Sequence, residues 1–391
     1  MNKKFKNIIY SLLILISLNN ELISQQIFIP FNDLTEIDSV NIRFTAVGDL
    51  MCHGTQLLYA ETSKDSFDFR PVYRKVKNIF KLSDFVMGNL ETVIEAPGLP
   101  YAGYPMFNSP LSFIEALKYS GFDFLFTTNN HSVDQGTSGI KSTISSLTKI
   151  GLEYHGTFLS VEDSDSIRIF NRNGINFVIL SYTYDINGTR LPSSKNFMIS
   201  KIDTIKMADD FNRAKLLNPD LILTYLHFGT EYKREPNKYQ RRIVEKVKTL
   251  GGDIIISSHP HALQPIEFFE TPYSKIDSGF VIYSLGNFIS NQRWRYSDAG
   301  VILNFDISKN LKSGKLKLED VSFIPTWVYK GYTEIGKEFV VYPADEVFSG
   351  SLPQYFTEKD KELMEESYFD AIDIITRYSK RPRLISNYRH E

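Results

Sequence analysis

The order of apolar and polar positions predicts a chain in which strands and helices alternate. Short apolar runs typical of buried strands lie at 41–47, 84–87, 122–127, 175–182, 221–226, 253–257, 280–285 and 301–306. Helix-like segments lie at 112–119, 139–150, 237–250 and 358–378. This order predicts an α/β fold of layered sheets flanked by helices, in which residues just beyond the strand ends meet at one edge.

The N-terminus has a different pattern. Lys3, Lys4 and Lys6 precede an apolar stretch at 8–18, which predicts a signal peptide over residues 1–24. An uncleaved membrane anchor is the alternative, although the apolar stretch is short for a membrane-spanning helix. In either case we expect the protein to work outside the cytoplasm, as a periplasmic, secreted or membrane-anchored protein.

The predicted organisation along the chain is a linker at 25–40, a main domain at 41–330 and an accessory C-terminal extension at 331–391.

Composition and charge narrow the choice of partners. A formal net charge of −2 over 391 residues argues against a nucleic-acid partner, because such proteins usually carry a basic surface. The single cysteine, Cys52, excludes an internal disulfide and a thiolate metal cluster. It is either a catalytic thiol next to His53 or, more commonly, a small buried side chain at a strand end.

Most of the seven histidines follow strand-like runs, in motifs that also carry acids or amides. These motifs are Gly48-Asp49 with His53, Gly88-Asn89-Leu90-Glu91, Asn129-Asn130-His131, Tyr225-Leu226-His227-Phe228-Gly229 and His259-Pro260-His261. Imidazole and carboxylate groups together suit divalent ions such as Zn, Mn or Fe. Pro260 disfavours a helix, so alternation along an extended segment would place His259 and His261 on the same side. Asp49 alone also has an ordinary interpretation as a turn or cap residue.

Six stretches of the chain together resemble the capsule-synthesis CapA family (the poly-γ-glutamate capsule protein domain), a branch of the calcineurin-like metallophosphoesterase superfamily. They are Ala46-Val47-Gly48-Asp49-Leu50-Met51, Gly88-Asn89-Leu90-Glu91, Asn129-Asn130-His131-Ser132-Val133-Asp134-Gln135-Gly136, His227-Phe228-Gly229-Thr230-Glu231-Tyr232, His259-Pro260-His261-Ala262-Leu263-Gln264-Pro265 and Tyr283-Ser284-Leu285-Gly286-Asn287-Phe288. The stretches span roughly residues 44–290 in the family's order. The resemblance implies a layered α-β-β-α sandwich of the metallophosphoesterase type.

The resemblance also implies a centre that holds two divalent metal ions, Mn, Zn or Fe. By this likeness one ion would be held by Asp49, His53 and His261, and the other by Asn130, His227 and His259. Glu91 would bridge the two ions, because cations about 3.5–4 Å apart repel each other unless a shared anion screens them. The spacing from Asp49 to His53 is wider than the Asp-x-His of phosphoesterases in general, which leaves the role of His53 open.

The remaining candidate residues are expected around the metals. His131 would act as a general acid or as a donor to transition-state oxygens. Asp134 could set the tautomer of His131, cap the helix that begins near residue 136, or do both. The candidates for lining the cleft and contacting substrate are Glu231, Tyr232, Asn287 and Arg293. Each has an ordinary alternative, such as a surface ion pair for Glu231, a loop turn for Asn287 and a solvated charge for Arg293.

Three functional hypotheses follow from these residues. The first is an exported metal-dependent hydrolase acting on a phosphorus or carbonyl centre in an anionic cell-surface polymer, either poly-γ-glutamate or a polysaccharide. The second is a non-catalytic, metal-stabilised binding or export module within a capsule-assembly complex. The third, a metallopeptidase for γ-glutamyl links, differs from the first only in substrate. Membrane-bound capsule synthesis proteins are expected as further partners.

Overall fold

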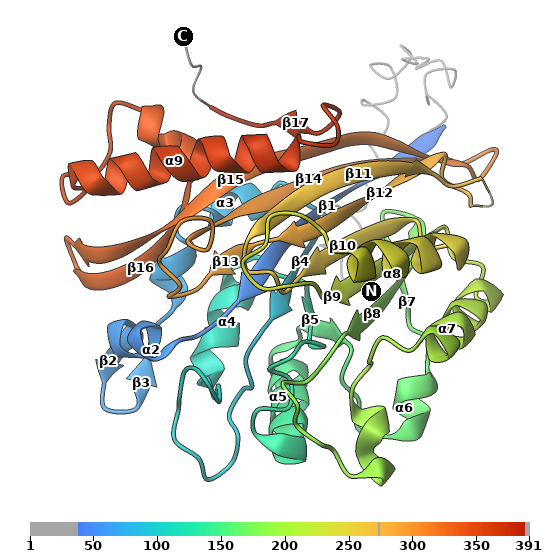
Figure 1. Ribbon diagram of the computed structural model, residues 1–391, viewed down its shortest axis with the longest axis horizontal. Helices are drawn as coiled ribbons and strands as arrows, with labels where there is room; N and C mark the ends of the chain where they lie inside the picture. Colours follow the sequence, from blue (N-terminus) through green and yellow to red (C-terminus); the bar gives the residue numbers. More distant parts are fainter. Residues whose placement is uncertain (1–37, 273, 388–391) are drawn as a thin grey trace, which may run out of the picture. The chain divides into compact units, whose positions relative to one another are not determined.

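The computed structural model describes residues 38–272 and 274–387. The predicted signal peptide, and all of the predicted linker but its last residues, lie outside these ranges. Ser39–Glu391 belongs to one compact unit (Figure 1). Within 38–272 and 274–387, none of the helices has the length and apolar character needed to cross a membrane.

The first sheet combines parallel and antiparallel strands. Its order is β16 (Gly336–Pro343), β15 (Leu316–Thr333), β14 (Ala299–Asn310), β1 (Ser39–Leu50), β4 (Phe85–Leu90), β5 (Phe124–Phe126) and β6 (Glu153–His155). Two short strands join it at the side, β13 (Asn287–Ile289) on β1 and β17 (Arg383–Leu384) on β15. The neighbours from β1 to β6 are parallel, so their carboxyl ends lie at one edge of the sheet.

The second sheet has the order β11 (Leu263–Glu270), β12 (Ser278–Leu285), β10 (Ile254–Ser258), β9 (Leu221–His227), β8 (Ile175–Thr183) and β7 (Ile169–Arg172). Strands β8, β9, β10 and β12 are mutually parallel. The sequences of these strands are nearly continuous apolar runs, because both faces of each strand are covered. A small separate hairpin joins β2 (Glu61–Ser63) to β3 (Ser66–Phe67).

The main core lies between the two sheets and is rich in aromatic rings. Phe44 of β1 stacks on Phe305 at 4.9 Å between ring centroids and meets Phe177 of β8 edge-on at 5.1 Å. Phe126 at the end of β5 stacks on Tyr225 of β9 at 4.0 Å. Each such buried ring contributes roughly 1.5–3 kcal/mol relative to an exposed one. These contacts hold the two sheets face to face.

Helices cover the outer faces of both sheets, which confirms the predicted α-β-β-α layering (Figure 1). The first sheet carries α2 (Gly54–Ala60), α3 (Lys77–Phe80), α4 (Leu111–Ser120) and α5 (Gly136–Ile150). The second carries α7 (Thr204–Leu216) and α8 (Lys238–Thr249). The remaining short elements are α6 (Val161–Asp165) and the 3-10 turns η2 (Arg70–Tyr73), η3 (Ser193–Met198) and η4 (Ala344–Phe348).

The C-terminal residues continue the first sheet. Strand β15 runs across residue 330, where the sequence predicts the start of an extension, and β16 pairs with it along its length. Helix α9 (Glu358–Ile375) follows, and its Met364 and Tyr368 belong to one buried cluster with Trp327 and Tyr329 of β15. The capping box formed by Thr357 and Asp360 fixes the start of this helix.

Candidate metal centre

The candidate centre lies where parallel strands of both sheets end. Asp49 is the penultimate residue of β1, and Glu91 directly follows β4. His227 is the last residue of β9, and His259 directly follows β10. A Cβ at Gly48 would come within 1.9 Å of the Gly286 carbonyl oxygen, so only glycine allows the end of β1 to approach the loop before β13.

Two clusters of candidate ligands meet there. The first cluster is Asp49, Glu91 and His227, and the second cluster is Glu231, His259 and His261. Within each cluster, one ligand atom per residue lies within 4.8 Å of those of the other two. All of these residues except Glu231 are buried.

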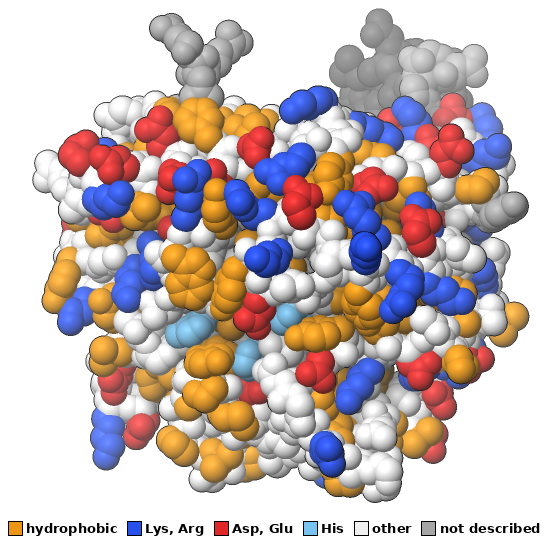
Figure 2. Space-filling view, viewed as in Figure 1, with side chains coloured by type: hydrophobic (Ala, Val, Ile, Leu, Met, Phe, Trp, Pro, Cys, Tyr) orange, Lys and Arg blue, Asp and Glu red, His pale blue; other side chains and the backbone are white. Residues whose placement is uncertain are grey.

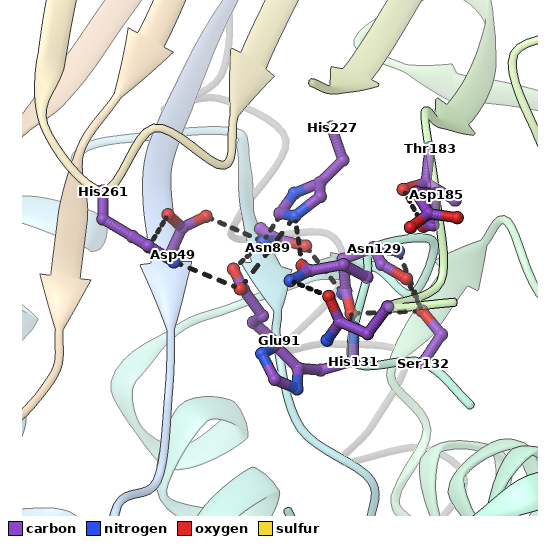
Figure 3. A network of polar contacts seen from close by, with 12 residues as sticks. Asp49, Asn89, Glu91, Asn129, His131, Ser132, Thr183, Asp185, His227 and His261 are labelled. Carbon is purple, nitrogen blue, oxygen red and sulfur yellow. Dashed lines mark hydrogen bonds and ion pairs between the residues drawn. The ribbon is translucent and has the colours of Figure 1, made fainter. Parts of the chain in front are cut away.

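The two clusters are joined by short contacts (Figure 3). The Nδ1 atom of His261 lies 3.0 Å from Oδ2 of Asp49, and its Nε2 atom lies 3.7 Å from Oε1 of Glu91. The Nε2 atom of His227 lies 3.9 Å from the same Glu91 oxygen. Oδ1 of Asn130 lies 2.7 Å from Nε2 of His227, so this amide also reaches the first cluster. Glu91 therefore stands between two imidazoles, one from each cluster.

Burial and mutual contacts shift the pKa values of the residues at this centre. Burial and the nearby Asp49 raise the pKa of Glu91 well above its ordinary value. Burial is the largest single effect on Asp49 and acts to raise its pKa, but the hydrogen bond and charge of His261, together with His227 and the Asn89 amide, outweigh burial and lower this pKa. Burial lowers the pKa of His227 well below its ordinary value and that of His259 to about 3, so both imidazoles are neutral. Neutral imidazoles beside paired carboxylates are the donor set of a divalent cation.

Two buried polar atoms at the centre are consistent with a bound cation. Oε1 of Glu91 and Nδ1 of His259 have no hydrogen-bond partner within the part of the chain that the structure describes. An unpartnered buried polar atom is costly, and more so when it is charged. A cation at the centre would satisfy both atoms and offset the repulsion between the carboxylates.

The clusters differ from the ligand sets that the resemblance implies. Glu231, predicted to contact substrate, offers a carboxylate oxygen to His259 and His261. His53 belongs to neither cluster among the described residues. It begins α2, where its Nδ1 atom accepts from the backbone N–H of Asn291 at 3.3 Å and lies 3.2 Å from Oε1 of Gln56. The structure therefore does not bring His53 into either cluster.

The backbone at the two neighbouring histidines also differs from the extended segment predicted. His259 has φ 103° and His261 has φ 53°, both in the left-handed region that non-glycine residues seldom occupy. Both imidazoles still face the same centre, with ring centroids 5.9 Å apart. Such conformations cost roughly 1–3 kcal/mol each and concentrate at functional sites.

Asn89 is a central residue that the sequence analysis did not single out. Its side-chain amide donates to Oδ1 of Asp49 at 2.8 Å and to Oε2 of Glu91 at 2.9 Å, and it lies 3.4 Å from Nδ1 of His227. Its own oxygen accepts from the Asn129 amide at 3.0 Å. Asn89 thus holds all three members of the first cluster in place. Its position in the Gly-Asn-Leu-Glu motif was the available signal.

His131 and Asp134 form a buried pair beside the clusters. The Nδ1 atom of His131 lies 2.8 Å from Oδ2 of Asp134, which also accepts the backbone N–H of Phe107 at 2.8 Å. The residue at the cap position of α5 is Gln135, which makes no side-chain cap. Of the two roles considered for Asp134, its contacts are therefore those of a partner that orients His131.

The structure places the other predicted cleft residues in different positions relative to the centre. Oδ1 of Asn287 lies 3.1 Å from Nδ1 of His261, and the Tyr232 ring lies 6.0 Å from the His261 ring. Arg293 instead turns into the protein, where its guanidinium donates to the Val328 carbonyl at 2.6 Å. The structure thus brings Asn287 and Tyr232 to the centre but not Arg293.

The fold and the two clusters define a layered α/β protein with a centre suited to divalent metals, and comparisons with known proteins give its family. The model of the bacterial capsule synthesis protein PGA_cap family matches residues 43–292. The chain therefore belongs to this family.

Two curated relatives are similar over about two thirds of their lengths. The PGA biosynthesis protein CapA of Bacillus subtilis (strain 168) is 28% identical over 272 residues, which cover 68% of this chain and 67% of that protein. The capsule biosynthesis protein CapA of Bacillus anthracis is 26% identical over 282 residues, covering 70% and 66% respectively. Among solved structures, the NAD nucleotidase NadN of Haemophilus influenzae matches with 11% identity and a TM-score of 0.47, covering 90% of this chain and 65% of that one.

Proposed function

We propose that this chain is an exported protein with a divalent-metal hydrolase-type centre. It would act in the synthesis, processing or export of an anionic capsule or cell-surface polymer. The observation that carries the proposal is Glu91, a fully buried carboxylate with an unpartnered oxygen that faces His227 and His261. A structural role alone does not explain why an ionisable group is retained in that position, whereas a cation-binding role does.

The two clusters give each cation its own set of donors. One ion would be held by Asp49, Glu91 and His227, with the Asn130 oxygen close by. The other would be held by Glu231, His259 and His261. When bound, such ions act as Lewis acids that polarise a phosphoryl or carbonyl oxygen and activate water.

His131 would supply the proton that a leaving group needs. Asp134 engages Nδ1 of His131, so donation to the leaving group would come from Nε2. The His131 ring lies 4.7 Å from the Phe107 ring and meets it edge-on, which fixes the imidazole plane. Asn89 and Asn287 would act as positioning residues for the two clusters.

The names of the relatives support a role in the cell envelope. Two curated relatives are named for PGA biosynthesis and capsule biosynthesis. We extend that pathway to this chain, with an extracytoplasmic location, a capsule polymer as ligand and membrane-bound capsule synthesis proteins as partners. The formal net charge of −2 agrees with a partner other than nucleic acid.

Elemental analysis and a substrate panel test this proposal. Protein purified without chelator is expected to contain about two divalent ions per chain. Turnover of phosphodiester, phosphomonoester or γ-glutamyl substrates with added Mn²⁺ or Zn²⁺ should disappear in His131→Ala while the metal content stays the same. Metal binding with no turnover in either protein would instead favour the non-catalytic module. A metal content well below one ion per chain would refute the centre itself.

A further inference from the structure

The mouth of the candidate centre is bordered by exposed aromatic side chains, which we call the aromatic rim. The rim consists of Tyr104, Tyr184, Tyr232 and Trp294, whose exposed fractions are 71%, 39%, 42% and 50%. Figure 2 shows histidine side chains reaching the surface near the middle of this face, with hydrophobic side chains on several sides. Single exposed apolar residues are ordinary, but a group around one polar site marks a binding surface.

Contacts place each member of the rim at the centre. The Tyr104 ring lies 6.4 Å from the His131 ring, and the Tyr184 ring lies 4.7 Å from the His259 ring. Tyr232 lies beside His261, and its other neighbour is Trp294, whose ring lies 5.2 Å away at a T-shaped angle.

The rim is also held in position by its loops. Tyr232 adopts φ 63°, and its backbone N–H donates to the Pro260 carbonyl at 2.6 Å. Its hydroxyl accepts a long hydrogen bond from Gln292 at 3.4 Å, which links it to the loop that carries Trp294. A large side chain kept exposed on a strained backbone gains nothing for stability, so binding is the better explanation.

Two arginines beside the rim already have partners within the protein. Nearby arginines are engaged elsewhere: Arg234 donates to the Tyr296 hydroxyl at 2.7 Å, and Arg295 pairs with Asp370 at 2.8 Å.

We propose that the aromatic rim binds the sugar rings of a polysaccharide and presents one of its linkages to the candidate centre. The electron-rich faces of Tyr and Trp attract the weakly positive C–H faces of sugar rings. A poly-γ-glutamate chain has no such ring faces. This inference rests on the proposed function, since it chooses between the two polymer classes named there.

Tryptophan fluorescence tests the inference directly. The chain has two tryptophans, and Trp327 is fully buried, so quenching by acrylamide reports on Trp294. The probes are hexamers of cellulose, hyaluronan and polygalacturonate, a poly-γ-glutamate of similar length, and a six-nucleotide oligo-dT. We expect a glycan hexamer to bind most tightly and to protect Trp294 from the quencher, at low and at moderate salt.

Variants show whether the rim is responsible. Trp294→Ala should weaken glycan binding, followed by calorimetry, by about tenfold or more, whereas Trp294→Phe should retain most of it. Tyr119→Ala is the matched control. Tyr119 is 55% exposed, but it lies near the C-terminal end of α4, which leads to the start of β5, whereas the centre lies at the carboxyl ends of the strands. The inference is overturned if no glycan binds, if poly-γ-glutamate or oligo-dT binds more tightly, or if Trp294→Ala binds like wild type.

Measurements in chelator separate this result from the test of the centre. Stacking on the rim needs no metal, so a glycan should still bind metal-free protein, although with lower affinity. Glycan binding without metal content would leave the rim intact and refute the centre. Metal content and turnover without glycan binding would support the centre and refute the role of the rim.

Discussion

Replacing Glu91 by glutamine should make the metal-free protein more stable while removing its capacity for metal. Glu91 is fully buried, its pKa is raised by burial and by Asp49, and one of its oxygens is unpartnered. Folding therefore carries an electrostatic cost at neutral pH that a bound cation would offset. Glutamine has nearly the same shape and no charge.

The magnitude follows from the contacts of this side chain. A glutamine oxygen can still accept the Asn89 amide, seen at 2.9 Å from Oε2 of Glu91. The new amide N–H₂ would face the nitrogens of His227 and His261, which lie 3.9 and 3.7 Å from Oε1. Removing the charge of a buried group that has an unpartnered oxygen is worth about 1–3 kcal/mol. In a chain of this length, each kcal/mol of added stability raises Tm by about 1–2 °C.

The sign of the pH dependence provides an internal control. The folded-state pKa of Glu91 is above its ordinary value of 4.5, so the carboxyl group is protonated in both states below that pH. There the variant and the wild type should be equally stable. As the pH rises above 4.5, the wild type loses stability relative to the variant until the folded-state pKa is passed.

Urea denaturation at pH 5 and pH 8, with EDTA and with Mn²⁺, measures these effects. Mn²⁺ at about 100 times its Kd should add about 2.7 kcal/mol per bound ion to the wild type, and much less to Glu91→Gln. A variant that is less stable than the wild type in EDTA at pH 8 would refute the reasoning, because the protein itself would then compensate the buried charge.

Three further substitutions test other parts of the centre. Asn89→Asp adds a third carboxylate beside Asp49, so it should lower the unfolding free energy in EDTA by about 1–3 kcal/mol and tighten divalent binding in calorimetry; equal stability in EDTA would contradict this. Asp134→Asn should reduce turnover about a hundredfold or more through loss of the His131 orientation, with unchanged metal content; loss of metal would mean a structural role instead. Arg293→Met should cost about 1 kcal/mol of stability without changing polymer binding, and weaker binding at full stability would show that the sequence prediction for this arginine was right.

Much of the layered fold could be predicted from local apolar patterns. The predicted helix at 139–150 corresponds to α5, and the predicted helix at 237–250 corresponds to α8. Helix α7 was not predicted, because it buries only three apolar residues, Met207, Phe211 and Ala214, and most of its other residues are polar. The continuation of the sheet beyond residue 330 depends on long-range pairing with β15, which no local pattern reveals.

The candidate site shows a similar division. Its convergence was predictable because Asp49, Glu91 and His227 lie at the ends of parallel strands. The detailed grouping was not, because it depends on left-handed backbone at His259 and His261, a rare conformation that the sequence does not signal.

The division of the clusters between two sheets has a consequence for how the protein matures. Asp49 and Glu91 come from the first sheet, whereas His227 and His259 come from the second, up to about 200 positions later in the chain. The first sheet by itself cannot assemble either cluster, and the distant pairing that brings His227 to Asp49 and Glu91 forms slowly. Loading with cations would therefore come last and would mark chains whose two halves have docked correctly. A truncated product ending before residue 227 lacks His227 and the whole second cluster, so it should stay empty even where its local structure has formed.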